Sequence, residues 1–351
     1  MKKLIVCIFR NFCICVLIGI VGYFLTSLIW TSVAIAGGVF FFTLLLPVYK
    51  VVNYVFRKSF CFRDVFDYLK FADAMPQHLD IVNLGSSSGK YAFDYKDLKI
   101  KGGNWALAPQ TLYYDFNILK QYHSYLRPGA AVLIPLCPFS GCIVNFTDPK
   151  INGRYSTFLH PALLHDYSSK QMKISRTFLV HPLWNCYRIL GMKNFVRNIG
   201  VSLLKKSAVS RTGNLSGEAA VERDARQRME SWKEQFAIKD LSAVVSHQNG
   251  EAIKYNISLL KDMVEFCRER ELRPVIVLPP VSDVLYSKFP GSFKEAYIEP
   301  LLYALEASWV EVLDYWEEER FQKSCFFQDS FLLNAKGRGL FMATVLQDLK
   351  L

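Results

Sequence analysis

A run of three serines between two glycines is the part of the chain whose residue types could do chemistry. In LDIVNLGSSSGKYAFDY, residues 79–95, a hydrophobic stretch leads directly into GSSSG at residues 85–89. Three kinds of site place a glycine-flanked turn after a hydrophobic strand. They are a phosphate-binding loop, the nucleophile elbow of α/β-hydrolases and the nucleophile turn of a further hydrolase class.

Spacing excludes the first kind of site, and placement argues against the second. A phosphate-binding loop needs four residues between its first glycine and a Gly-Lys pair, and then a serine or threonine for magnesium. Here three serines separate Gly85 from Gly89-Lys90, and Tyr91 follows the lysine. GSSSG does satisfy the elbow pattern, but that elbow follows several strands and needs a histidine near the C-terminal end. The last histidine is His247, and its surroundings do not resemble a catalytic loop.

A second block near the end of the chain favours the third kind of site. FFQDSFLLNAKGRGLF, residues 326–341, places Asp329 in a loop before a terminal helix. A serine turn after the first strand, combined with such a closing block, resembles the SGNH/GDSL hydrolases. The resemblance is closest to the membrane-anchored branch that includes the D-alanyl transfer protein of teichoic acid modification and the alginate O-acetylation proteins, where GSS replaces GDS. It covers about residues 78–137 and 250–345.

The resemblance implies roles for particular residues. Ser87 takes the nucleophile position and would attack an acyl carbonyl, while Asp329 would orient the catalytic base. The stretch NWALAPQTLYYDFNILKQY, residues 104–122, resembles the block that helps to form the oxyanion hole, and Asn104 and Gln110 are its best-placed polar residues for an oxyanion or substrate contact. Both are also common turn residues, so a purely structural role stays open.

One departure from the family pattern bears directly on activity. The histidine of Asp-x-x-His is replaced by Leu332, although Asp329, Leu333, Asn334 and Gly337 agree with the closing block. A serine hydroxyl needs a base, whose help typically contributes 10²–10⁴-fold, and leucine supplies no lone pair. Whether the protein is an enzyme is therefore open.

Three explanations of the missing base remain. Another histidine reaches the site; a different base gives weak activity; or the site is degenerate, so that the protein is a pseudoenzyme that binds a ligand or partners a membrane O-acyltransferase. The histidines available are His78, His123, His160, His165, His181 and His247.

The N-terminal region predicts a membrane anchor over residues 1–60. Residues 11–48 are almost wholly apolar. This stretch is longer than the ~20 residues that one helix needs to cross a bilayer, so it can form one or two hydrophobic helices. Residues 1–63 hold seven basic and no acidic residues, out of a net charge of +11. Basic residues that flank apolar segments are typical of membrane insertion, and this distribution argues against nucleic acid as a partner. One span would export the larger domain and a hairpin of two would leave it in the cytoplasm, and the sequence leaves this topology open. The resemblance implies the bacterial inner (cytoplasmic) membrane, with the larger domain outside the cytoplasm and an envelope glycan as substrate.

Strand-like and helix-like runs alternate over residues 61–351. Strands are predicted at LDIVNLG, AAVLIPL, VIVLPP and WVEVLDY, with helices between them. This alternation predicts an α/β domain with a doubly wound parallel sheet of about five strands, in three layers of the SGNH or flavodoxin-like kind. A charged stretch at about residues 165–248 interrupts the pattern and is interpreted as an inserted helical or lid segment.

No residue pattern indicates a metal or another cofactor. The nine cysteines form no CxxC pairs, and no histidines lie near them at ligand spacing. We interpret them as small buried side chains, and we expect no cofactor.

Overall fold

The computed structural model describes residues 29–57, 67–71, 75–96, 98–146, 149–165 and 217–351, with isolated positions before residue 29 and between residues 193 and 200. The chain divides into two units, one of Met1–Phe66 with Val180–Val209 and the other of Asp67–Leu179 with Ser210–Leu351. The serine motif and the closing block both belong to the second unit.

The first unit contains helix α2, which runs from Ile29 to Arg57 and includes Pro47. Within the part of the chain that the structure describes, no helix combines the length and the apolar character needed to cross a bilayer. Much of the predicted anchor, over residues 1–60, lies outside the described residues. The anchor therefore stays a prediction.

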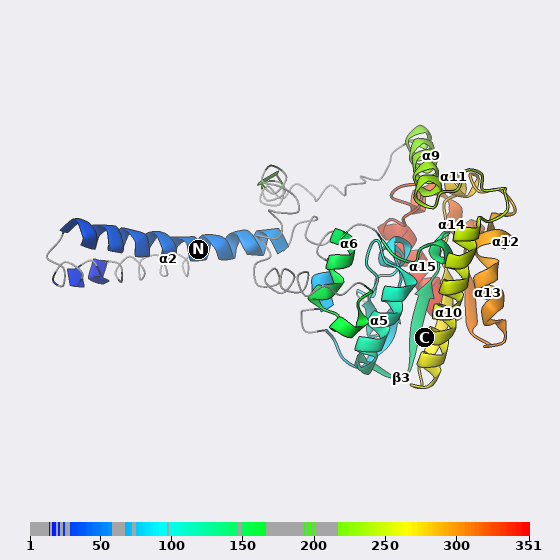
Figure 1. The fold of residues 1–351 in the computed structure, drawn as a ribbon, viewed down its shortest axis with the longest axis horizontal. Coiled ribbons are helices and arrows are strands. Elements are labelled where there is room, and N and C mark those ends of the chain that lie inside the picture. The colour runs from blue at the N-terminus through cyan, green and yellow to red at the C-terminus, as the bar shows by residue number, and fades with distance from the viewer. Residues whose placement is uncertain are drawn as a thin grey trace. The chain divides into compact units, whose positions relative to one another are not determined.

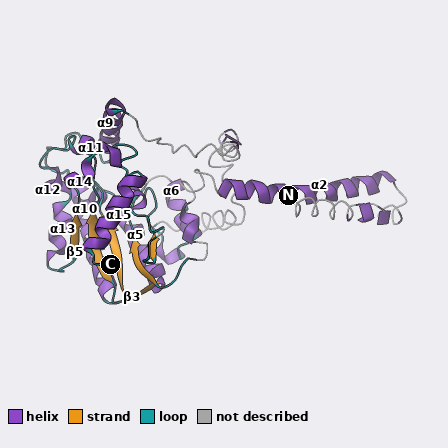
Figure 2. Ribbon diagram, turned by 180° about the vertical axis from the view of Figure 1, so that it is seen from behind, coloured by secondary structure: helices purple, strands orange, loops and turns teal. Residues whose placement is uncertain are grey.

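The second unit is built on a sheet of five parallel strands in the order β2-β1-β3-β4-β5 (Figure 2). The strands are β1 (Leu79–Asn83), β2 (Gly102–Asn104), β3 (Leu126–Pro135), β4 (Arg273–Leu278) and β5 (Glu311–Asp314). The four apolar runs predicted as strands all lie in this sheet, so the α/β class and the parallel sheet are confirmed. The fifth strand, β2, was not predicted by its sequence, because Gly-Gly-Asn has no apolar pattern.

Helices cover both faces of the sheet. On one face α5 (Leu112–Tyr122) and α13 (Glu299–Glu306) pack beside α10 (His247–Arg268) (Figure 1). On the other, α4 (Ser87–Ala92) packs against α15 (Ala335–Asp348), whose apolar residues join strand residues in one core cluster. This arrangement gives the three layers predicted from the alternating pattern.

Shorter elements connect these layers. They are η1 (Asp67–Phe71), η2 (His123–Tyr125), η3 (Ser140–Cys142), α6 (Pro149–Gly153), η4 (Tyr155–Thr157), η5 (Pro161–Leu163), α11 (Asp283–Tyr286), α12 (Phe293–Tyr297), α14 (Glu319–Gln322) and η6 (Ser324–Phe326). One longer helix, α9 (Glu218–Gln235), belongs to the charged stretch predicted as an insertion.

The strand order places a crevice between β1 and β3. After β1 the chain first adds β2 on one side, and it then crosses to β3 on the other side. In parallel α/β sheets with this order, ligands bind at such a switch point, outside the carboxyl ends of the strands. The GSSSG turn follows the carboxyl end of β1 directly, so the fold puts the serines at the edge where a ligand is expected.

Candidate functional site

Backbone geometry accounts for both glycines of the serine turn. Gly85 has a φ of +108°, and a Cβ there would lie 3.2 Å from Cγ of Pro135 at the end of β3. At Gly89 a Cβ would lie only 2.6 Å from the carbonyl oxygen of Leu84. Glycine is required at both positions because a side chain would be strained or would clash. The motif is therefore a structural turn as well as a source of hydroxyl groups.

The three serines of the turn have different surroundings. Ser86 Oγ accepts a hydrogen bond from the Gln110 backbone N–H at 3.0 Å. Ser88 Oγ lies 2.7 Å from Cys137 Sγ, where either atom can donate. Ser87 is the first residue of α4 and lines a pocket, and its hydroxyl has no hydrogen-bond partner among the described residues. Ser87 is therefore available to a ligand.

The pocket lies at the carboxyl edge of the sheet and has a volume of about 170 Å³. Polar residues of its lining include Ser86, Ser87, Gln110 and Asp115, together with Thr111, Ser140 and Gln235. Much of the rest of its wall is aromatic, contributed by Phe139, Phe146, Trp232, Phe236 and Phe331. A few convergent polar groups in a largely apolar cavity are typical of sites for small organic ligands.

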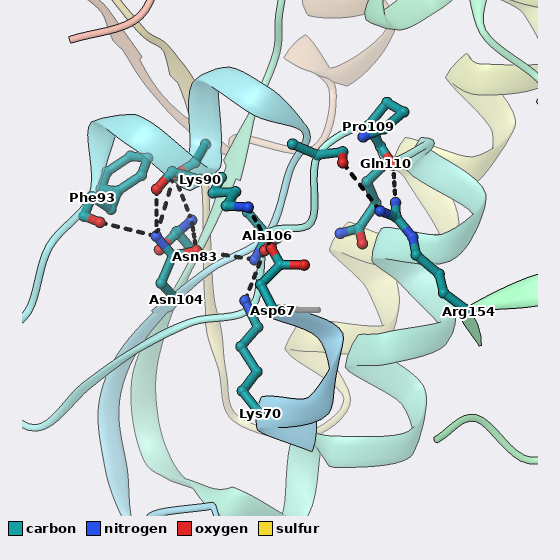
Figure 3. A network of polar contacts seen from close by, with 12 residues as sticks. Asp67, Lys70, Asn83, Lys90, Phe93, Asn104, Ala106, Pro109, Gln110 and Arg154 are labelled. Atoms are coloured by element: carbon teal, nitrogen blue, oxygen red, sulfur yellow. Dashed lines mark hydrogen bonds and ion pairs between the residues drawn. The ribbon is translucent and has the colours of Figure 1, made fainter. Parts of the chain in front are cut away.

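Gln110 and Asn104 differ in what their side chains contact. Gln110 lines the pocket, and its Nε2 donates to Asp115 Oδ1 at 2.5 Å. Asn104 does not line it, because its Nδ2 donates to the carbonyl oxygens of Lys90 and Phe93, at 3.1 and 2.9 Å (Figure 3). Asn104 thereby joins the end of β2 to the end of α4. Of the two predicted oxyanion or substrate residues, only Gln110 lies with Ser87.

Asp115 brings a carboxyl group into the pocket. Its side chain is buried, and Oδ1 accepts hydrogen bonds from the Gly85 backbone N–H at 2.7 Å and from Gln110 Nε2. Burial raises the pKa of Asp115 to about 7, although both hydrogen bonds act in the opposite direction. The pocket therefore contains an acid that changes protonation state near neutral pH.

The closing loop holds Asp329 in a different way. Asp329 Oδ1 accepts hydrogen bonds from the backbone N–H groups of Phe331 and Leu332, at 2.8 and 2.7 Å. Its Oδ2 lies 3.2 Å from Nη2 of Arg228, which projects from α9. Burial raises the pKa of Asp329, and the guanidinium of Arg228 opposes that rise. The partner that the family pattern assigns to a histidine is here an arginine.

A second carboxylate shares Arg228. Asp224 Oδ2 lies 3.2 Å from the same Nη2, and it accepts hydrogen bonds from the Ser330 hydroxyl at 2.6 Å and the Ser330 N–H at 3.0 Å. Together these contacts join α9 to the closing loop at two successive residues, Asp329 and Ser330.

The pocket lining includes some of the predicted site residues and omits others. Ser87 and Gln110 line the pocket, whereas Asp329 and Leu332 do not, and the residue of the closing loop that reaches it is Phe331. Leu332 is half-buried, and its carbonyl oxygen accepts a hydrogen bond from the Gln328 N–H at 2.8 Å.

None of the described histidines lines the pocket. His78 precedes β1, His123 follows α5, His247 begins α10, and His160 and His165 lie near η5. The sixth histidine, His181, lies outside the described residues.

Three contributors to the site were missed by the sequence analysis. Asp115 had a signal, because it lies on the buried stripe of α5 formed with Leu112, Phe116 and Leu119. A carboxylate at such a position requires either a partner or a pocket. Trp232 and Arg228 lie on a helix with a solvated composition, and no sequence signal linked them to the site. The ring of Trp232 packs edge-on against Phe331, with the ring centroids 5.2 Å apart.

Metal and thiol chemistry find no support in the part of the chain that the structure describes. No group of histidine, cysteine, aspartate or glutamate side chains there is arranged to hold a metal ion. Cys137, Cys142, Cys267 and Cys325 are free thiols, and burial raises the pKa of the Cys137 thiol, so a reactive thiolate is disfavoured.

The sequence matches no protein-family model and no curated protein.

Proposed function

We propose that this chain is a membrane-anchored, SGNH-like protein of the bacterial cell envelope whose serine pocket binds an acyl-bearing glycan without hydrolysing it. Its ancestry lies in serine esterases or O-acyltransferases that act on glycans. The observation that carries the proposal is the ion pair between Asp329 and Arg228, on a loop where Leu332 stands at the position of the base.

The ion pair argues against turnover for a chemical reason. A general base must accept a proton from the serine hydroxyl, but an arginine stays protonated and has no lone pair to offer. Asp329 cannot orient an imidazole while its Oδ1 is held by two backbone N–H groups and its Oδ2 faces a guanidinium. The described residues that line the pocket include no histidine to replace it.

The pocket itself supports ligand binding. Ser87 offers an uncommitted hydroxyl, and Gln110 and Asp115 add polar groups beside it. The aromatic wall suits the apolar part of a small acyl group, and the polar end suits its carbonyl or ester oxygens.

The anchor and the location are part of the proposal. They rest on the apolar run at residues 11–48 and on the seven basic residues before residue 64. The resemblance adds a membrane-bound O-acyltransferase as the protein partner, with the larger domain outside the cytoplasm.

Absence of turnover and presence of binding are tested separately on the purified full chain. We expect a serine-directed fluorophosphonate to label the wild type no more than Ser87→Ala, and p-nitrophenyl acetate to be hydrolysed at the same rate by both. Calorimetric titration with methyl 6-O-acetyl-glucoside should show binding to the wild type. Ser87→Trp, whose indole fills the pocket, should lose it. Labelling that depends on Ser87 would contradict the proposed lack of turnover, and an unbound acetylated sugar would contradict the binding role.

A second variant asks whether one lost residue explains the inactivity. Leu332→His restores the family pattern, yet Arg228 still holds Asp329, and Leu332 does not line the pocket. We expect esterase activity to rise less than about 10-fold, well below the 10²–10⁴-fold that a working base contributes. A serine-dependent gain of 10²-fold or more would instead show that the rest of the relay is intact.

A further inference from the structure

Asp115 has one oxygen that the protein holds and one that it leaves to the pocket. The two hydrogen bonds that its carboxyl accepts, from Gly85 and Gln110, both go to Oδ1. Oδ2 accepts none from the described residues, and no described cation forms an ion pair with this carboxyl. Asp115 is nevertheless 2% exposed and lines the pocket. The free oxygen is therefore the one that a bound ligand would meet.

Arg154, which contacts the loop before Gln110, donates its hydrogen bonds to groups other than Asp115. Arg154 donates through Nη2 to the carbonyl oxygen of Pro109 (Figure 3). It also donates through Nη1 to the carbonyl oxygen of Ala108 at 3.1 Å, and through Nη2 to the Tyr155 hydroxyl. These bonds hold the loop that carries Gln110. They position the loop, but they do not bring the positive charge of Arg154 into an ion pair with Asp115.

The other titratable groups facing Asp115 are neutral at physiological pH. Cys137 follows β3, and Tyr155 lies on η4 with its hydroxyl 3.4 Å from Gln110 Oε1. Burial raises the pKa of both groups above its usual value, and the negative charge of Asp115 adds to that rise. Neither group supplies positive charge, so the ionised form of Asp115 is stabilised by the two hydrogen bonds at Oδ1 and by the N-terminus of α5, and no described cation pairs with it.

A bound ligand shifts the equilibrium between the neutral and the ionised form of Asp115. With a pKa of about 7, Asp115 is present in both forms near neutral pH. An uncharged ligand that fills the pocket removes water from Oδ2, and loss of water disfavours the carboxylate further. The same ligand can accept a hydrogen bond from the neutral acid. Both effects favour protonation when the ligand binds.

We propose that Asp115 is a specificity-determining residue of this pocket, which in its neutral form donates the Oδ2 hydrogen to the carbonyl or ester oxygen of an uncharged acyl group. The proton comes from solvent, so binding to the carboxylate form takes up one proton. The ligand class is thereby narrowed to neutral acyl esters, and acylated groups that carry a carboxylate are disfavoured. This inference rests on the proposed function, because it assumes that an acyl group enters the pocket.

The test measures affinity and proton uptake together. Methyl 6-O-acetyl-glucoside is titrated into the purified full chain at pH 6, 7 and 8, in pairs of buffers with different ionisation heats. For a group with a pKa of about 7, the dissociation constant should rise about 10-fold from pH 6 to pH 8. Net uptake should approach one proton at pH 8. Methyl glucoside, which lacks the acyl group, should bind at least about 10-fold more weakly at pH 6.

Two variants isolate Asp115. Asp115→Asn keeps an oxygen for Gly85 and Gln110 and places an N–H donor where Oδ2 stood, so it should bind as the wild type does at pH 6 and should do so at every pH. Asp283→Asn, an exposed carboxylate on α11, is the matched control and should keep the wild-type pH profile. Proton uptake is measured on the wild type, so the test holds even where Asp115→Asn folds poorly.

The outcomes separate this inference from the function on which it rests. If the acetylated sugar binds the wild type equally at pH 6 and pH 8, or more tightly at pH 8, the role of Asp115 is overturned while the binding function stands. If the sugar binds at no pH, the proposed function fails, and the role of Asp115 fails with it.

Discussion

Two buried carboxyl groups lie at the carboxyl edge of the sheet, and they differ in their partners. Asp115, beside the serine turn, is held by two hydrogen bonds at one oxygen and has no described cation. Asp329, on the closing loop, is held by two hydrogen bonds and by Arg228. Burial raises the pKa of both, but only at Asp329 does a positive charge oppose the rise. Asp329, which the sequence resemblance points to, is thus held in a structural ion pair, whereas Asp115 lines the pocket and has one oxygen without a partner among the described residues.

Of the three changes predicted here, removal of the Arg228 cation should reduce the stability of the protein most. Arg228→Met would leave Asp329 and Asp224 without their shared positive charge. Breaking one side of a buried pair typically costs about 3–5 kcal/mol of stability. We expect a loss of this size in chemical denaturation of the full chain. Arg226→Met, at an exposed pair on the same helix, should change stability by less than about 0.5 kcal/mol. Equal losses in the two variants would show that Arg228 is no anchor.

The second prediction concerns the stability cost of ionising Asp115. The folded pKa of about 7 lies above the ordinary value of 3.8 for this carboxyl, so the folded state binds the proton more tightly than the unfolded chain. The neutral form is favoured in the fold, and stability is therefore lost as pH rises from about 4 to about 7. Asp115→Asn removes this loss. Its stability relative to the wild type should increase by up to roughly 4 kcal/mol between pH 4 and pH 8. Denaturation curves at both pH values measure the increase, and a difference that does not vary with pH would place the Asp115 pKa near its ordinary value.

The smallest of the three effects tests the turn that carries the serines. Gly85→Ala introduces a side chain at positive φ, 3.2 Å from Pro135, and we expect a loss of about 2 kcal/mol. Gly129→Ala is the matched control, because Gly129 also has positive φ but a Cβ there meets nothing within 4 Å. Its loss should be about 1 kcal/mol in the same melting or denaturation experiment. If the two losses are the same, close packing against β3 contributes little to the turn.

The sequence predicted the fold better than it predicted the site. Buried parallel strands such as β3 and β4 are continuous apolar runs, so their positions are visible without knowledge of tertiary contacts. The turn after β1 was visible too, because its glycines meet a backbone requirement. The short strand β2 was not, since Gly-Gly-Asn at the sheet edge is held by pairing with β1 rather than by apolar burial.

The site depended on contacts between distant segments. Asp329 was identified from its local motif, but its partner Arg228 lies on a charged helix that the sequence indicates only as a solvated surface. The same helix supplies Trp232 to the pocket wall, and Phe236, the residue that follows the helix, also lines the pocket. Conversely, Asn104 was a reasonable polar candidate, and its side chain proved to be engaged with carbonyl oxygens at the end of α4. Residue type alone does not tell whether a polar side chain faces a cavity or forms hydrogen bonds with backbone carbonyl groups.

The strand order also has a consequence for how the chain folds during synthesis. The pair β3 and β4 is joined residue by residue from Ala131–Arg273 to Pro135–Val277, with the whole charged stretch and α10 intervening in the sequence. A ribosome adding about 5–20 residues per second needs on the order of 10 s to make that interval. During this time β1, β2 and β3 can pair, but β3 has an open hydrogen-bonding edge, which is a site for wrong association until β4 arrives. Such long-range pairing slows folding, and it makes the early half of the domain the segment most in need of a chaperone.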